Sequence, residues 1–153
     1  MFPLERIVCP VDFSPPSVRA LKTAEELADR FSAKLFILHV IPPIPEGDTE
    51  TGEPIGYNAP SGIGSFALQE YRKGLKSEAE TKITAMGKKE LGSDADYETV
   101  VVEGGKEADE INRFASERGA GLIVIASHGR TGLKRMVLGS VAERVIRLSE
   151  TPV

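Results

Sequence analysis

The sequence predicts an α/β fold in which helices cover both faces of a parallel, doubly wound sheet. Short segments that are apolar on both faces alternate along the chain with segments of helical periodicity. Strands buried on both faces are typical of parallel sheets, and right-handed crossovers place the connecting helices over the two faces. A chain of 153 residues can bury one core of this kind, so we expect a single domain over residues 1–153.

The first two strands and the first helix are the clearest elements. Arg6 to Val11 and Lys34 to Ile41 are predicted to be buried strands. Between them, Ser14 is expected to cap a helix that begins at Pro15, since serine is a favoured N-cap residue and proline suits the first helical position. The apolar residues of this helix recur at helical spacing: Val18, Leu21, Ala24, Leu27, Ala28 and Phe31.

A segment rich in glycine and proline follows the second strand. Gly and Pro occupy ten of the 23 positions from Pro42 to Gly64. Because neither a helix nor a strand tolerates that density, we expect a loop over 42–64 within the domain. A loop of this length serves as a lid, as a partner surface or as a disordered segment, and the sequence leaves these alternatives open.

The second half of the chain continues the alternation. A long amphipathic helix that Gly92 can terminate is predicted from Leu68, Tyr71, Leu75, Ala79, Ile83 and Met86. A third strand is predicted in DYETVVVEG. The next helix is predicted to end at Gly119, and its apolar face consists of Ala108, Ile111, Phe114 and Ala115. The remaining elements are a strand over Gly121 to Ala126, a helix over Ser140 to Leu148 and the start of a fifth strand in TPV.

Composition argues against two classes of partner. The formal net charge is -4, and Lys and Arg are interspersed with Asp and Glu, whereas proteins that bind nucleic acid gather basic residues on one face. No apolar run approaches the ~20 residues of a membrane span, and Glu5 and Arg6 interrupt the region where a signal peptide would be apolar. We therefore expect a cytoplasmic protein that binds neither nucleic acid nor membranes.

Cysteine and histidine give no pattern of nucleophilic catalysis, so no catalytic residue is predicted. Cys9 is the only cysteine and lies in an apolar run, as expected of an inert core thiol. His39 lies inside the second strand and is expected to be a hydrogen-bonded core residue. His128 follows the fourth strand, where it either donates to a phosphate or is simply exposed.

The loop between the fourth strand and the last helix has features of an anion site. Ser140 and Glu143 match the S-x-x-E capping box. Other first-turn amides stay unpaired and point into the loop, where a phosphate would satisfy them. Glycines at 129, 132 and 139 allow close backbone approach, and Arg130, Lys134 and Arg135 add positive charge. The alternative is an ordinary connection with a solvated basic face.

Three segments together resemble the universal stress protein family over essentially the whole chain: RIVCPVDFS, LFILHVI and SHGRTGLKRMVLGSVAERVI. Family members that bind ATP carry a glycine, two residues, a second glycine, nine residues, and then a glycine followed by Ser or Thr. Gly129 matches the second glycine, Gly139 and Ser140 close the pattern, and Ala126 replaces the first glycine. The methyl group of Ala126 is tolerated where its φ is ordinary and is a hindrance where φ is positive.

The resemblance implies a Rossmann-like sheet of five parallel strands in the order 3-2-1-4-5, with the fifth strand truncated at Val153. It implies a homodimer that binds ATP, ADP or AMP, with Mg²⁺ held through the phosphates. The residues implied at the phosphates and ribose, with Arg130 added for its charge, are Ala126, Ser127, His128, Gly129, Gly139, Ser140 and Val141. Those implied at the nucleoside are Pro10, Val11, Asp12 and Val40.

Two of the implied nucleoside residues have chemistry of their own. Asp12 follows a buried strand, where a carboxylate can accept from ribose hydroxyls; alternatively, it caps the first helix. Val40 can offer backbone groups and an apolar edge to adenine, or it is simply a core residue.

The function that best fits these features is an ATP-dependent stress-response module, regulatory or protective, with at most slow hydrolysis. One alternative is a nucleotide-independent protein-interaction module, which Ala126 favours. The other is an adenylyl-transfer enzyme of related architecture, which would need a substrate site that only the loop over 42–64 could hold.

Overall fold

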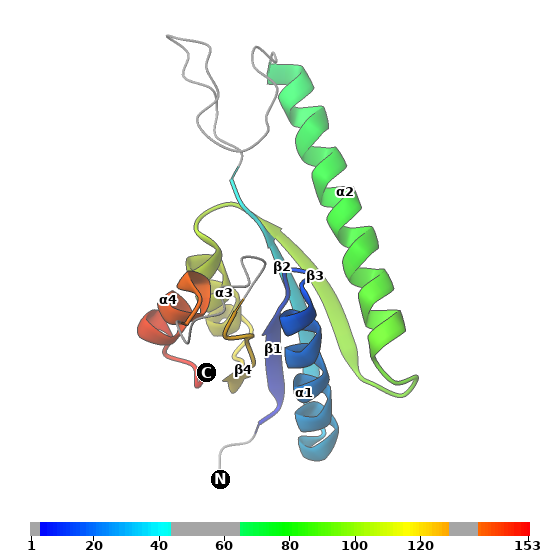
Figure 1. Cartoon of the computed structure of the whole chain (residues 1–153), viewed down its shortest axis with the longest axis vertical. Coiled ribbons are helices and arrows are strands. Elements are labelled where there is room, and N and C mark those ends of the chain that lie inside the picture. Colours follow the sequence, from blue (N-terminus) through cyan, green and yellow to red (C-terminus); the bar gives the residue numbers. More distant parts are fainter. Residues whose placement is uncertain (1–3, 44–64, 129–137) are drawn as a thin grey trace.

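A computed structural model describes residues 4–43, 65–128 and 138–153. The elements in chain order are β1 (Arg6–Pro10), α1 (Pro15–Phe31), β2 (Lys34–Ile41), α2 (Ser65–Glu90), β3 (Tyr97–Glu103), α3 (Glu107–Glu117), β4 (Leu122–Ile123) and α4 (Ser140–Leu148). The strands form one parallel sheet in the order β3-β2-β1-β4. Helices α1 and α2 lie on one face and α3 and α4 on the other (Figure 1), which confirms the predicted α/β class.

The core has two halves because successive strand residues point to opposite faces of the sheet. In β1, Ile7 and Cys9 pack with α1 and with Ile83 of α2. Val8, between them in sequence, packs instead with α3 and with Val145 of α4. The same alternation continues in β2, so the central strands are buried on both faces, as a parallel sheet requires.

Helix α1 begins as predicted. Ser14 is the N-cap, with extended backbone angles, and its hydroxyl accepts a hydrogen bond from the N–H of Ser17. Proline occupies the first turn, where no N–H is needed. The prediction that Phe31 faces the core is wrong: its side chain is 50% exposed. Phe31 is the last residue of α1, followed by Ser32 in the left-handed region, so the helix ends before this ring can be covered.

Side chains of α1 hold the carboxyl-terminal end of α2. Lys22 Nζ donates to the carbonyl oxygen of Glu90 at 2.7 Å and lies 3.3 Å from its carboxylate. Glu25 accepts a hydrogen bond from the N–H of Gly92. These contacts place a cation at the negative end of the helix dipole and fix where α2 stops, close to the predicted Gly92.

Helix α2 buries only part of its predicted apolar face. Ala79 and Ile83 are buried against the sheet. Leu68, Tyr71 and Leu75 keep partial exposure, because the amino-terminal half of α2 extends past the strand ends (Figure 1). None of the helices within the described ranges combines the length and the apolar character needed to cross a membrane.

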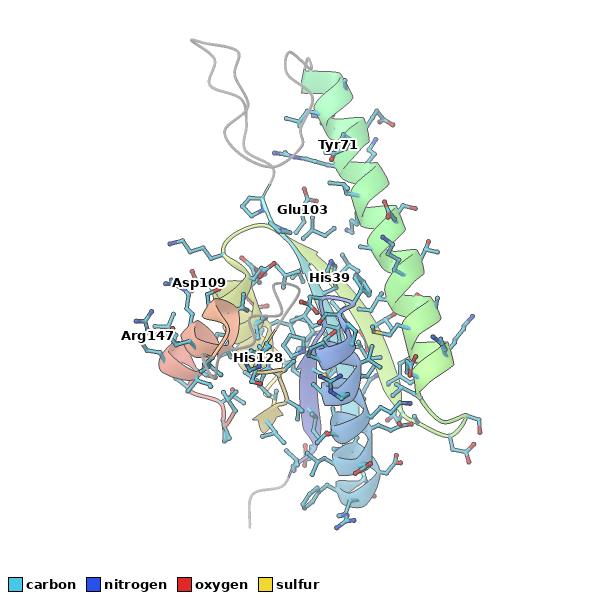
Figure 2. The ribbon with its side chains drawn as sticks, in the orientation of Figure 1. His39, Tyr71, Glu103, Asp109, His128 and Arg147 are labelled. Carbon is cyan, nitrogen blue, oxygen red and sulfur yellow. The ribbon has the colours of Figure 1, made fainter. Side chains whose placement is uncertain are left out.

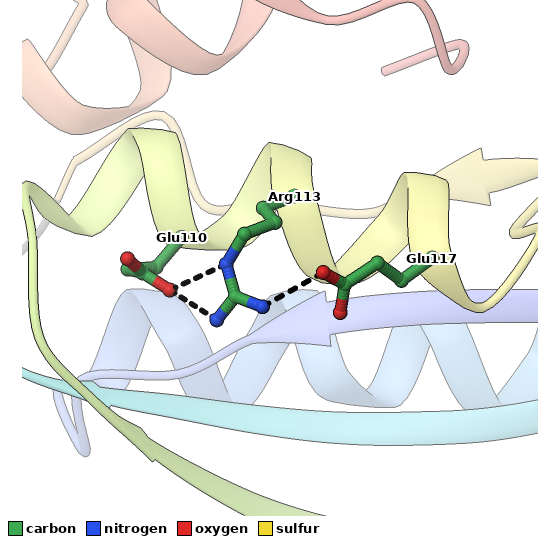
Figure 3. A network of polar contacts seen from close by, with 3 residues as sticks. All are labelled: Glu110, Arg113 and Glu117. Atoms are coloured by element: carbon green, nitrogen blue, oxygen red, sulfur yellow. Dashed lines mark hydrogen bonds and ion pairs between the residues drawn. The ribbon is translucent and has the colours of Figure 1, made fainter.

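Charged side chains organise α3 and its contact with α4. Arg113 bridges Glu110 and Glu117 along the exposed side of α3 (Figure 3). Arg144 of α4 donates two hydrogen bonds to the Asp109 carboxylate of α3, at 3.0 and 3.1 Å. This bidentate pair fixes the orientation of α4, and its hydrogen bonds lower the pKa of Asp109.

Strand β4 is shorter than the predicted strand over Gly121 to Ala126, since it covers only Leu122–Ile123. The N–H of Val124 still donates to the carbonyl oxygen of Val8 at 2.9 Å. The next bond of this parallel ladder would come from the N–H of residue 10. Pro10 has no N–H, so the ladder stops there.

The predicted fifth strand does not form in the described residues, and the strand order is 3-2-1-4 rather than 3-2-1-4-5. The N–H of Thr151 donates to Ser149 Oγ, and Pro152 has no N–H to give to the sheet. The carbonyl of Pro152 accepts from the N–H of Ile123 at 2.8 Å. This segment therefore lies beside β4 and lacks the repeated bonds of a strand.

Two glycines of α2 should respond in opposite ways to alanine. A Cβ on Gly87 would lie 2.7 Å from the ring of Tyr97, whereas a Cβ on Gly74 meets nothing within 4 Å. Gly74→Ala should raise the free energy of unfolding by about 0.5–1 kcal/mol through helix propensity. Gly87→Ala should lower it by about 1–3 kcal/mol, since α2 must move away from β3. Urea unfolding of both variants measures this, and an equal gain for both would contradict close packing at Gly87.

Candidate functional site

The candidate site lies at the carboxyl ends of β1 and β4. The chain leaves β1 toward α1 on one face of the sheet, and α4, which follows β4, lies on the other face (Figure 1). Ligands of doubly wound sheets bind at such a point, where neighbouring strands lead to opposite faces. The sequence predicted a set of site residues, and those within the described ranges lie at or just after the ends of β1, β2 and β4 or at the start of α4.

The end of β1 passes into a hydrogen-bonded turn. Val11 continues the ladder for one more bond, from its N–H to the carbonyl oxygen of Leu38 at 2.8 Å. Asp12 accepts hydrogen bonds from both the N–H and the hydroxyl of Ser14. Ser14, and not Asp12, caps α1, so the carboxylate supports the capping residue.

His39 joins this turn to β2. Figure 2 labels His39 near the upper end of the sheet. Its Nδ1 lies 2.8 Å from the carbonyl oxygen of Val11, and its ring contacts that of Phe13 at a tilt of 42°, with centroids 4.5 Å apart. The ring is partly buried, which confirms the expected hydrogen-bonded histidine. Phe13 has a φ of 64°, and neither this backbone angle nor its contact with His39 could be inferred from residue types.

The end of β4 and the start of α4 are held together. The N–H of Gly139 donates to the carbonyl oxygen of Ser127 at 2.7 Å. Two residues that are 12 positions apart in the sequence are thereby brought next to each other, while Gly129 and Arg130 lie outside the described residues. Within the described ranges, only Phe13 and Ser32 among non-glycine residues have positive φ. Ala126 therefore has an ordinary φ, and its methyl group causes no backbone strain.

The predicted capping box at the start of α4 is wrong. The N-cap is Gly139, with φ −61° and ψ 146°, and Ser140 is already the first helical residue. Gly139 accepts at its carbonyl oxygen from the N–H of Glu143 and has no side chain to cap the first turn. The amides of Ser140, Val141 and Ala142 therefore receive no bond from the N-cap residue, and the positive end of the dipole faces the end of β4.

The two polar side chains after β4 contact each other. Ser127 Oγ lies 2.9 Å from His128 Nδ1, with Ser127 exposed and His128 partly buried. His128 thus has a side-chain partner, and its role toward a phosphate remains a prediction. Cys9 lies below the site in the core, where burial raises the pKa of its thiol to about 12, as expected of an inert thiol. No metal-binding group of three or more His, Cys, Asp or Glu side chains occurs among the residues that the structure describes.

The sequence matches the model of the universal stress protein family over residues 3–153. Universal stress protein MJ0531 of Methanocaldococcus jannaschii is 37% identical over 150 residues, covering 97% of this chain and 79% of that protein. Universal stress protein YxiE of Bacillus subtilis is 34% identical over 148 residues, covering 97% of this chain and 95% of the relative.

Solved structures agree with these relatives. Protein MJ0577 of M. jannaschii superimposes with a TM-score of 0.77 at 28% identity, over 99% of this chain and 94% of that one. The universal stress protein from Archaeoglobus fulgidus in complex with dAMP gives a TM-score of 0.55 at 26% identity. A further solved universal stress protein, in complex with cAMP, gives a TM-score of 0.55 at 25% identity. Each of these two covers 98% of this chain and 94% of its own. By sequence and by fold, the chain belongs to the universal stress protein family.

Proposed function

We propose that this protein binds an adenine nucleotide at the carboxyl ends of β1 and β4 and acts as a nucleotide-dependent stress-response module, regulatory or protective. The observation that carries the proposal is the glycine N-cap of α4, tied to the end of β4 by the Gly139–Ser127 hydrogen bond. A phosphate there would accept from first-turn amides that the cap residue leaves unsatisfied. The complexes of family members with dAMP and cAMP support an adenine ligand.

The proposed phosphate and ribose contacts come from the end of β4 and the start of α4. They are Ala126, Ser127, His128, Gly129, Arg130, Gly139, Ser140 and Val141. The proposed nucleoside contacts are Pro10, Val11, Asp12 and Val40. A carboxylate accepts up to about four hydrogen bonds, so Asp12 can serve the Ser14 turn and a ribose hydroxyl together.

ATP, ADP and AMP share the groups that this site would recognise, and we propose Mg²⁺ as the companion of ATP. The donor set fits this arrangement, because backbone amides bind phosphate directly and magnesium prefers phosphate oxygens and water. The ordinary φ of Ala126 removes the backbone argument for a nucleotide-independent module.

The protein should take up an adenine nucleotide with measurable affinity. Calorimetric titration with ATP and Mg²⁺, together with chromatography of the supernatant after denaturation, should detect bound or retained nucleotide. The expected result is saturable heat in the micromolar to millimolar range. Absence of both heat at millimolar ATP and retained nucleotide would contradict the proposal and favour a protein-interaction module.

Substitution at Gly139 should separate binding from folding. Its backbone angles suit any residue, so Gly139→Val should fold, at a cost of about 1 kcal/mol as a poorer N-cap. The valine side chain would occupy the phosphate position and abolish the rise in Tm that ATP produces through binding to the folded state. Gly139→Ala is the matched control, because it weakens the cap similarly and adds only a methyl group. A normal ATP shift in Gly139→Val would contradict this site.

Ser140→Ala should affect binding much more than stability. Because Ser140 is not the cap, the free energy of unfolding should change by less than about 0.5 kcal/mol. Loss of one hydrogen bond to a charged phosphate should raise Kd roughly tenfold to a hundredfold. Calorimetry and thermal unfolding of the same sample test both statements, and a loss of stability with unchanged Kd would assign Ser140 a structural role alone.

We also propose a homodimer through the surface beside β4. Ile146, Leu148 and Val153 are 50%, 48% and 44% exposed, and the Pro152 carbonyl bonds to β4 close to them in the chain. Light scattering should give a mass twice that of one chain. For Ile146→Lys, the measured mass should fall to that of a single chain. Phe31→Lys is the matched control, since Phe31 is equally exposed at the end of α1. Loss of the dimer in the control alone would contradict this surface.

A further inference from the structure

The chain passes from β1 to α1 through a short turn, Asp12 and Phe13. On one side of the turn, the N–H of Val11 is bonded to the carbonyl oxygen of Leu38, which holds the end of β1 to β2. On the other side, Ser14 is fixed as the N-cap of α1. Because the sheet and the helix fix both ends, the change of direction falls on Asp12 and Phe13.

Phe13 takes part in this turn with an unusual backbone conformation. Its φ is 64°, in the left-handed region, where the Cβ of an L-residue crowds the following carbonyl oxygen. Gly, Asn and Asp enter this region more readily than an aromatic residue does. Strain of this kind persists only where the surrounding structure holds it, and it is found most often at functional sites.

The ring of Phe13 supplies contacts that hold this conformation. It lies against the ring of His39, with centroids 4.5 Å apart, and it packs against the half of the core that α1 and α2 cover. His39 is itself held, because its Nδ1 lies 2.8 Å from the carbonyl oxygen of Val11. A glycine would adopt the same φ without strain but would have no ring to hold the turn. The side chain of Phe13 therefore anchors the turn.

Asp12 is the residue that this turn holds most directly. One of its carboxylate oxygens accepts a hydrogen bond from the N–H of Ser14 at 3.0 Å and another from the Ser14 hydroxyl. Phe13 lies between these two residues in the chain, so rotation about its φ changes where the carboxylate lies relative to the start of α1. The position of the Asp12 carboxylate at the end of β1 thus depends on the conformation of Phe13.

We infer that Phe13 is a positioning residue, whose left-handed φ and ring contacts hold the Asp12 carboxylate in place for a ribose hydroxyl of the nucleotide. The part of this inference that concerns the ribose rests on the proposed function. The part that concerns the turn does not, because it follows from the backbone angle and the ring contact alone.

Two variants separate the backbone angle of Phe13 from its ring. Phe13→Ala removes the ring and keeps an L-residue, which resists a positive φ, whereas Phe13→Gly removes the ring and adopts this φ freely. Where φ is negative, alanine is the more stabilising of the two, because it restricts the unfolded chain. In the protein without nucleotide, Phe13→Gly should instead have the higher Tm, by about 2–4 °C, and both variants should unfold below the wild type.

Phe31 is the matched control, since it is a phenylalanine within the helix α1. There, the alanine variant should have the higher Tm of the two. An equal or higher Tm for Phe13→Ala than for Phe13→Gly would overturn the argument about φ. A Phe13→Gly variant more stable than the wild type would overturn the argument about the ring.

Calorimetry with AMP and with 2′,3′-dideoxy-AMP, which lacks both ribose hydroxyls, tests the role of Phe13 in binding. The wild type should bind AMP on the order of tenfold more tightly. Phe13→Ala should lose most of this preference by weakening AMP alone, and Phe13→Gly should keep more of it, because glycine adopts the required φ. Asp12→Ala should remove the preference, and Phe13→Ala added to Asp12→Ala should then change it no further.

An unchanged preference in Phe13→Ala, or equal weakening of both nucleotides, would mean a merely structural role and would overturn the inference. A further loss when Phe13→Ala is added to Asp12→Ala would overturn the claim that Phe13 acts through Asp12. If the wild type binds both nucleotides equally, the ribose contact fails while the proposed nucleotide site stands. If it binds neither, the proposed function fails and the ribose contact with it, while the Tm comparison still decides the turn.

Discussion

The fold depends on the burial of β1 on both faces and its pairing on both edges. Ile7, Val8 and Cys9 have no exposed surface, and the strand bonds to β2 on one side and to β4 on the other. Because adjacent side chains point to opposite faces, a single five-residue strand requires α1 on one side and α3 with α4 on the other. A polar residue at any of these three positions would remain in the core without a partner.

The same strand creates the site where its pairing stops. Pro10 ends the ladder to β4 because it lacks an N–H, and after the bond from Val11 to Leu38 the chain passes into the turn before α1. Ligands bind at the edge of an open parallel sheet, where its strands end, and here Pro10 and the turn after Val11 mark the end of β1.

The part of the site formed by the end of β4 and the start of α4 depends on the position of α4. Exposed ion pairs such as Glu110–Arg113–Glu117 contribute little individually, about 0.2–1 kcal/mol. Those pairs lie within α3, and α4 is anchored in the core by its buried residues Ala142 and Val145. The bidentate Arg144–Asp109 contact adds orientation, and the Gly139–Ser127 bond brings the helix start to β4. The packing of Ala142 and Val145 and the Gly139–Ser127 backbone bond together place the first turn of α4 at the carboxyl edge of the sheet.

The sequence by itself determined the order of the elements, because burial on two faces and helical periodicity are properties of local residue types. It predicted β2 and α4 to the residue, the Ser14 cap, and the buried face of α3. It also marked Gly139 and Ser140 through their spacing from Gly129. Each of these depends on neighbours within one element or on a pattern along the chain.

Only the tertiary structure decided features that depend on partners distant in sequence. The length of β4 is limited by a proline more than a hundred positions earlier, whereas the pairing of the third strand with β2 and of the fourth with β1 agrees with the order that the resemblance implied. Ser140 fits a capping box, yet the N-cap is Gly139, whose N–H bonds to the carbonyl oxygen of Ser127. His39 is a core histidine by sequence, but its bond to Val11 depends on the turn at Phe13. Hydrogen-bond partners across elements are chosen by packing, and residue types along the chain do not encode that choice locally.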